Sequence, residues 1–202
     1  MATVKEIPAK LVAELRAKTG AGMMDCKKAL EEAGGDMAKA EEILRVKYAG
    51  KADKRAARSA GEGVIDAYIH FNGKVGVLVE INCETDFVAR TDDFKQLARD
   101  VALQVASAKP VAVRIEDLPA DVVERERRIY EAQVVEQQKP ENIRFKIVEG
   151  MLKKFYQENV LLEQTFIKDD RQTVGDLVRG LAAKTGEKVE VKRFTRFELG
   201  GA

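Results

Sequence analysis

Apolar side chains recur every three to four positions along the first fifty residues, which is the spacing of amphipathic helices. The pattern predicts a first helix after Pro8, a second from Met23 to Glu32, and a third that Asp36 caps at its N-terminus. The residues expected to face inward are Leu11, Val12, Leu15, Met37, Ala40, Ile43 and Leu44. Three short helices bury only a small core, so we expect residues 1–50 to act as a docking domain.

Alternating apolar and polar residues between 64 and 81 replace the helical period and predict two β-strands. One apolar stripe consists of Ile65, Ala67, Ile69 and Phe71, and the other consists of Val75, Val77, Val79 and Ile81. Asn72-Gly73 between the stripes is a strong signal for a β-hairpin, usually one with a two-residue turn.

The register of this hairpin decides which faces the two stripes occupy. A two-residue turn pairs Phe71 with Lys74 and puts the stripes on opposite faces, whereas a register moved by one residue pairs Phe71 with Val75 and unites them. Because a united stripe can be buried as one surface, we predict the second register. It leaves Tyr68 and His70 on the outer face, near the tip of the hairpin.

Helical periodicity returns after the hairpin. Thr91 is expected to cap a helix that ends before Pro110, and two charged helices, beginning at Pro119 and after Pro140, are expected to form a helical hairpin. The inward stripe expected on the first charged helix is Val122, Ile129, Ala132 and Gln133. A helix over 174–184 and a strand over 187–199 complete an α+β fold, in which helices and a helical hairpin back a small antiparallel sheet.

Charge is distributed unevenly along the 202 residues, although the formal net charge is only +1. Residues 1–58 carry 13 basic and 9 acidic side chains, a net charge of +4. The basic excess lies between Arg45 and Arg58, where alanines fill most gaps, so this stretch is either a linker or a solvated helix. We therefore divide the chain into a domain at 1–50, a basic linker at 51–60 and an α+β core at 61–202.

Few features of the sequence suggest covalent chemistry. Gly20-Ala-Gly22 lacks the spacing of a phosphate-binding loop, and no nucleophile is evident for His70, the single histidine. Cys26 and Cys83 make neither a disulfide framework nor a zinc set, which favours a reducing cytoplasm. No uncharged run exceeds eight residues, so no membrane span and no signal segment are expected. We expect no metal, no cofactor and no enzymatic activity.

Two segments resemble the signatures of one family. Two motifs of bacterial elongation factor Ts are similar to Thr19-Gly-Ala-Gly-Met-Met-Asp-Cys-Lys-Lys-Ala-Leu30 and to Thr85-Asp-Phe-Val-Ala89. The likeness extends over nearly the whole chain through segments such as Thr173-Val-Gly and Arg196-Phe-Glu. Members of that family partner the translational GTPase elongation factor Tu and exchange its guanine nucleotide. The resemblance also implies a ubiquitin-associated-like fold for the three N-terminal helices.

The resemblance assigns a role to the segment after the hairpin. In the family, the Asp and Phe of the second signature insert between helices of the GTPase and disturb the element that holds Mg²⁺. By position these residues are Asp86 and Phe87, flanked by Thr85 and Val88. Tyr68-Ile69-His70 is similar to a family motif whose His reaches toward the partner's nucleotide site, so His70 is implied as a second contact.

The resemblance further puts Arg16, Met23 and Met24 on the docking surface of the N-terminal domain. Residue types alone predict other positions for some of these side chains than the family resemblance implies. Phe87 would fold back onto the core, one of the two methionines would pack inward, and His70 would be solvated or partly packed.

Partners follow from the same resemblance. Long family members carry two copies of the hairpin and a coiled-coil insertion, whereas this chain has one hairpin and lacks the insertion; short members pair two chains. We therefore expect a homodimer that binds elongation factor Tu in its GDP-bound and nucleotide-free states. The rival interpretation is a nucleic-acid-binding module that uses the Arg45–Arg58 stretch. The residues between these basic side chains are mainly alanines, whereas the stacking of bases needs aromatic residues.

Overall fold

The computed structural model describes residues 7–19 and 21–201, with the backbone alone given for 48–56. The chain divides into two compact units, each assembled from segments far apart in the sequence. The first contains residues up to Gly63 together with Asn82–Phe94 and Val178–Glu190, and the second contains Val64–Ile81, Lys95–Leu177 and the residues from Val191 onward. Helices combined with a small antiparallel sheet confirm the α+β class.

The N-terminal helices are α1 (Ala9–Thr19), α2 (Met23–Glu32) and α3 (Met37–Ala56). They enclose a core of their own, formed by Val12, Leu15, Ala21, Cys26, Ala29, Leu30, Ala40 and Leu44. Asp36 caps α3 as predicted, because its Oδ1 accepts hydrogen bonds from the backbone N–H groups of Ala38 and Lys39 at 2.9 and 3.2 Å. The helices and most of their inward residues were therefore predicted correctly.

Helix α3 continues through part of the stretch predicted as a linker. Its last residue is Ala56, so the helical alternative holds over residues 51–56. The division of the chain at residue 50 stays a prediction.

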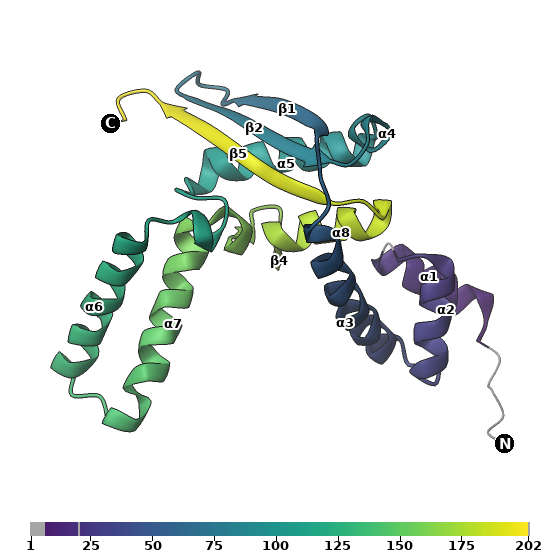
Figure 1. Ribbon diagram of the computed structural model, residues 1–202, viewed down its shortest axis with the longest axis horizontal. Helices are drawn as coiled ribbons and strands as arrows, with labels where there is room; N and C mark the ends of the chain where they lie inside the picture. The colour runs from purple at the N-terminus through teal and green to yellow at the C-terminus, as the bar shows by residue number, and fades with distance from the viewer. Residues whose placement is uncertain (1–6, 20, 202) are drawn as a thin grey trace. The chain divides into compact units, whose positions relative to one another are not determined.

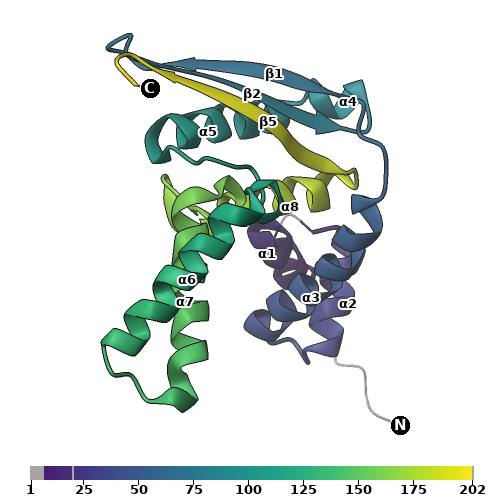
Figure 2. The same ribbon diagram turned by 60° about the vertical axis from the view of Figure 1, so that its left-hand side comes forward.

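Strands β1 (Glu62–Ile69), β2 (Val75–Cys83) and β5 (Val189–Glu198) form one sheet, with β2 in the middle. Helix α5 (Asp92–Ala108) lies along one face of this sheet in both views (Figures 1 and 2). The fully buried residues of β2 are Val77, Val79, Ile81 and Cys83, and those of α5 include Phe94, Ala98, Val101 and Val105. Apolar contact on this face holds the sheet and the helix together.

The predicted register of the hairpin is wrong. The backbone N–H of His70 donates to the carbonyl of Val75 at 2.9 Å, so residue 70 pairs with residue 75 and the two apolar stripes lie on opposite faces. Tyr68 and His70 are half-buried on the face that Val77 and Val79 share, not on the outer face. The turn determines this register: Gly73, with φ +67°, donates to the carbonyl of His70 at 2.8 Å and closes a tight loop.

A consequence of this register is an exposed apolar surface on the outer side of the sheet. Its residues are Ile65, Ile69, Phe71 and Leu78, and Phe71 is 92% exposed. Gly76 belongs to the same surface, because a Cβ atom at this position would lie 3.1 Å from Cδ1 of Ile69.

Helices α6 (Ala120–Glu136) and α7 (Glu141–Asn159) form the predicted helical hairpin. Val134 of α6 packs with Val148 and Leu152 of α7 in a small core. The stripe predicted on α6 is therefore correct only in part: Val122 and Gln133 are half-buried, whereas Ile129 and Ala132 are exposed. A helical period fits adjacent stripes almost equally well, and the packing against α7 selects the one that contains Tyr130 and Val134.

The remaining elements are the 3₁₀ turns η1 (Ile115–Asp117) and η2 (Leu161–Glu163), the paired strands β3 (Thr165–Phe166) and β4 (Asp169–Thr173), and α8 (Val174–Thr185). Two buried amides tie β3 to α5: Nε2 of Gln104 donates to Oε1 of Gln164 at 3.1 Å and to the carbonyl of Thr165 at 3.2 Å.

Candidate partner-binding site

An exposed aromatic side chain follows strand β2. The chain leaves β2 at Cys83 and forms the one-turn helix α4 (Asp86–Ala89). Ala89 faces the interior, whereas Phe87 is 80% exposed. The position of Phe87 contradicts the interpretation that it folds back onto the core, and agrees with the one that the family resemblance implies.

Several hydrogen bonds fix the ends of this short helix. Thr85 is extended, with φ −130° and ψ 153°, and its Oγ1 accepts a long hydrogen bond from the backbone N–H of Val88 at 3.5 Å. At the other end, Oγ1 of Thr91 donates to the carbonyl of Val88 at 2.7 Å and accepts from the N–H of Phe94 at 3.3 Å. Thr91 therefore links the end of α4 to the start of α5, and it caps α5 as predicted.

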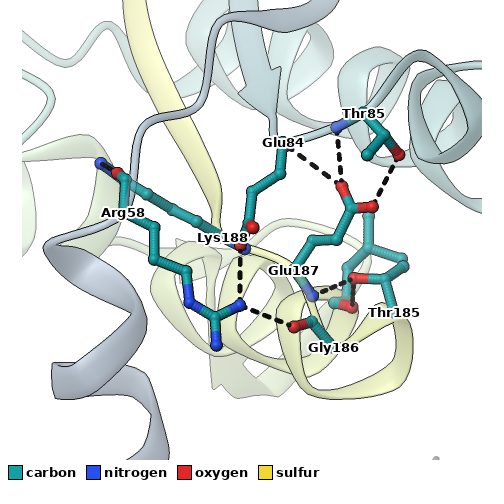
Figure 3. A network of polar contacts seen from close by, with 8 residues as sticks. Arg58, Glu84, Thr85, Thr185, Gly186, Glu187 and Lys188 are labelled. Carbon is teal, nitrogen blue, oxygen red and sulfur yellow. Dashed lines mark hydrogen bonds and ion pairs between the residues drawn. The ribbon is translucent and has the colours of Figure 1, made fainter.

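A carboxylate from a distant segment binds the N-terminal end of α4 (Figure 3). Oε2 of Glu187 accepts hydrogen bonds from the backbone N–H groups of Glu84 and Thr85 at 3.1 and 3.0 Å, and Oε1 accepts from Oγ1 of Thr85 at 2.6 Å. One side chain thus satisfies three donors on two consecutive residues.

The end of helix α8 places Glu187 at this point. Gly186 has φ +79°, a left-handed conformation that glycine adopts without strain, and its N–H donates to the carbonyl of Ala182 at 3.0 Å. The chain turns there, and Glu187 follows directly before strand β5.

Basic residues bind the neighbouring Glu84 from the other side of the network in Figure 3. Nη1 of Arg58 lies 3.2 Å from Oε1 of Glu84 and donates to the carbonyl of Gly186 at 3.5 Å, while the backbone N–H of Lys188 donates to the same carboxylate oxygen at 2.5 Å. The side chain of Lys188 also donates to the carbonyl of Arg58 at 3.1 Å. These contacts therefore join Arg58, which follows α3, to the segment that contains Glu84 and Thr85 and to the segment that contains Glu187.

Cys83 and Cys26 are buried thiols. Burial raises the pKa of Cys83, and the negative charge of Glu187 raises it further; burial likewise raises the pKa of Cys26. Sγ of Cys83 donates to the carbonyl of Thr85 at 3.1 Å, which is a packing role and not that of a nucleophile.

His70 lies in the second unit, at the tip of the hairpin. Its Nδ1 is 2.9 Å from the hydroxyl of Tyr68, and its ring contacts that of Phe71 with 4.4 Å between the centroids. Two aromatic neighbours hold the imidazole in place, so the partly packed interpretation of His70 is confirmed.

The N-terminal helices present the other predicted contacts. Met23 and Met24 begin α2 and are 56% and 64% exposed, and Arg16 on α1 is exposed as well. The alternative in which one methionine packs inward is therefore wrong. Flexible, polarisable methionines on a rigid helix end make an adaptable contact surface.

Over residues 7–19 and 21–201, leaving aside the side chains of 48–56, no group of three or more His, Cys, Asp or Glu side chains is placed to hold a metal ion. None of the helices within the same ranges is long and apolar enough to cross a membrane.

Sequence reasoning missed Glu187 and Arg58. Their contacts join positions 102 and 26 residues apart, and no local pattern marks such a pairing. The only signal was indirect: the predicted helix over 174–184 and the predicted strand over 187–199 put Glu187 at the start of the strand.

An exposed aromatic on a capped helix, together with an exposed methionine pair at the start of another helix, is typical of a protein that acts by docking onto another protein. Comparison with known sequences defines the family. The model of the family "Elongation factor TS" matches residues 3–201. The chain is 60% identical to elongation factor Ts of Thermotoga petrophila over 195 residues, which cover 96% of this chain and 97% of that protein.

Two further relatives are similar over comparable lengths. Elongation factor Ts of Carboxydothermus hydrogenoformans is 59% identical, with 96% of this chain and 89% of that protein covered, and that of Desulfosudis oleivorans is 54% identical, with 96% and 98% covered. The chain belongs to the elongation factor Ts family. This membership confirms that the protein is a translation elongation factor and not an enzyme.

Proposed function

We propose that this protein is a guanine-nucleotide exchange factor for elongation factor Tu, and that it promotes GDP release without covalent chemistry. The observation that carries the proposal is the position of Phe87, a large apolar side chain held 80% exposed on a helix whose ends are fixed by hydrogen bonds. We call residues Thr85–Val88 the exchange loop. On the family resemblance, this loop inserts near the Mg²⁺ and phosphate site of the GTPase.

Exchange of this kind is a coupling between two binding events, in which factor and nucleotide each weaken the binding of the other by the same factor. A nucleotide held with nanomolar affinity is bound by about 12 kcal/mol, whereas burial of one phenylalanine contributes about 1.5–3 kcal/mol. Phe87 therefore needs further anchors on the partner. Its role is to direct the deformation toward the Mg²⁺ site, where the cation is the largest local charge.

The anchors in this proposal are the exposed surfaces described above. Arg16, Met23 and Met24 bind the GTPase through the N-terminal domain, and His70 contributes a contact at the hairpin tip. The exposure of Arg16, Met23 and Met24 supports their role, and the contacts of His70 with Tyr68 and Phe71 at the tip support the role of His70.

The proposal includes a homodimer. The outer face of the sheet exposes four large apolar side chains, Ile65, Ile69, Phe71 and Leu78, and exposed apolar patches commonly mark interaction surfaces. A second copy covers it through a two-fold axis, and so supplies the second hairpin that the long family members carry within one chain.

Ion pairs within the protein argue against the competing interpretation, in which the basic stretch binds nucleic acid. Nζ of Lys47 lies 3.0 Å from Oδ1 of Asp25, and Arg58 is bound to Glu84. Basic side chains engaged within the protein are less available to phosphates. We accordingly infer that the protein binds no nucleic acid directly. Membership of the elongation factor Ts family supports the further proposal that it acts in the cytoplasm and not on a membrane.

The reciprocity of the coupling provides a test. The nucleotide-free complex of this protein with elongation factor Tu should be isolated by gel filtration and then titrated with GDP. We expect GDP to dissociate the complex, because each ligand weakens the other. A complex that stays intact at saturating GDP would show that the two bind independently, which is incompatible with exchange activity.

A further inference from the structure

We infer that Glu187 is a positioning residue for the exchange loop. Its carboxylate fixes Thr85 and thereby the position at which Phe87 is presented to the partner. This inference rests on the proposed function. The basis is the triple hydrogen bond of Figure 3, in which the two oxygens of Glu187 bind the N–H groups of Glu84 and Thr85 and the hydroxyl of Thr85, at distances between 2.6 and 3.1 Å.

The hydroxyl of Thr85 has two functions that depend on each other. It donates its single proton to Oε1 of Glu187, so a lone pair of Oγ1 is directed at the backbone N–H of Val88. Without the carboxylate, the hydroxyl can rotate and the cap of α4 loses its defined orientation.

Helix α4 cannot hold this position by itself. It has four residues, and one helical turn is unstable in water without tertiary contacts. The ion pair between Asp86 and Arg90 lies within the helix and its C-cap, so it does not attach the helix to the fold. Attachment comes from Glu187 and the Sγ of Cys83 at one end, and from the buried side chain of Ala89 and the hydroxyl of Thr91 at the other.

Loss of Glu187 should therefore reduce the fraction of molecules that present Phe87 in the productive place. When only a fraction of a protein is competent to bind, its apparent affinity falls by that fraction, while the complex that does form is the same. The signature of a positioning role is thus a higher half-saturating concentration with a nearly unchanged maximal rate.

The test measures release of fluorescent GDP from elongation factor Tu against the concentration of the intact protein. For Glu187→Ala we expect the half-saturating concentration to rise about tenfold, equivalent to about 1.4 kcal/mol, with a maximal rate within about twofold of wild type. Glu187→Gln keeps one oxygen acceptor, so it should recover part of this loss. Glu198→Gln is the matched control, because Glu198 also accepts hydrogen bonds from two side chains, Lys109 and Arg196, but lies at the end of β5.

A double variant that combines Glu187→Ala with Phe87→Ala distinguishes a positioning role of Glu187 from a general structural role. If Glu187 acts through Phe87, Glu187→Ala added to Phe87→Ala should cause little further loss, whereas independent effects would multiply. Multiplying effects would overturn the inference, as would a half-saturating concentration for Glu187→Ala equal to that of wild type.

Amide hydrogen exchange gives a readout that does not depend on the partner. The N–H groups of Glu84 and Thr85 should exchange at least tenfold faster in Glu187→Met, which keeps the length of the side chain and removes both oxygen acceptors, than in wild type; unchanged exchange would overturn the inference even if Glu187→Ala fails to fold. Failure of the proposed function has a different signature: the wild-type protein itself would not accelerate GDP release.

Discussion

Phe87→Ala should lower exchange activity strongly while leaving the fold almost intact. The side chain is 80% exposed, so folding buries only about a fifth of it. Because full burial of a phenylalanine contributes about 1.5–3 kcal/mol, truncation should lower the free energy of unfolding by roughly 0.5 kcal/mol or less. For a chain of this size, such a change lowers Tm by about 1–2 °C.

The expected effect on exchange is larger, because docking buries the part of the ring that folding leaves exposed. If about 1.4 kcal/mol of contact is lost in the transition state for GDP release, the stimulated rate falls about tenfold. Stopped-flow fluorescence of labelled GDP bound to elongation factor Tu measures this rate directly, and thermal denaturation followed by circular dichroism measures stability on the same samples.

Two other phenylalanines serve as controls. Phe145 on α7 is also exposed, so Phe145→Ala should change neither stability nor exchange; Phe94 at the start of α5 is fully buried, so Phe94→Ala should lower stability by about 3–5 kcal/mol. If Phe87→Ala lowers stability by about 3 kcal/mol, the residue has a packing role and the reasoning is wrong. An unchanged rate of GDP release would refute its role in the exchange loop.

Three further predictions concern other parts of the molecule. Exposed Met23 and Met24 should contribute affinity, so the double variant Met23→Ala/Met24→Ala should bind elongation factor Tu more weakly, by calorimetry, yet reach the same maximal exchange rate; unchanged affinity would remove the docking role. Light scattering should give a dimer of about 45 kDa, twice 22.4 kDa, that persists in reducing agent, and Ile69→Asp should give the monomer; a wild-type monomer at micromolar concentration would contradict the proposed interface. Hydrogen bonds from Arg196 and Lys109 lower the pKa of Glu198 from 4.5 to about 2, so the stability that this carboxylate contributes is present above pH 4.5 and lost as the pH falls toward 2. The difference in urea unfolding between wild type and Glu198→Gln should shrink over that range, and a difference that is constant with pH would contradict the assignment.

Local signals predicted the helices well but not the register of the hairpin. Asp36 and the glycines that follow α2 specify helix ends through contacts within a few residues, so they can be recognised in the sequence. The predicted register assumed that both apolar stripes must be buried within one chain. The turn at Gly73 gives the other register, and the stripe that contains Ile69 is left exposed.

The candidate site was predictable only in part. The family motif identified Phe87, and the structure agrees with its exposure, but the residues that hold the loop come from other regions of the chain. Glu187 reaches Thr85 across 102 positions, and its geometry depends on where α8 ends relative to β2. Contacts of this kind follow from tertiary packing, which a single sequence without an alignment does not encode in any short pattern.

The most direct test of the account is the rate of GDP release from elongation factor Tu as the concentration of this protein is raised in the presence of Mg²⁺. The account predicts a rate that rises with concentration and saturates at least a hundredfold above the intrinsic rate, equivalent to about 2.7 kcal/mol of barrier. A rate that stays at the intrinsic value, while gel filtration shows that the complex has formed, would contradict it.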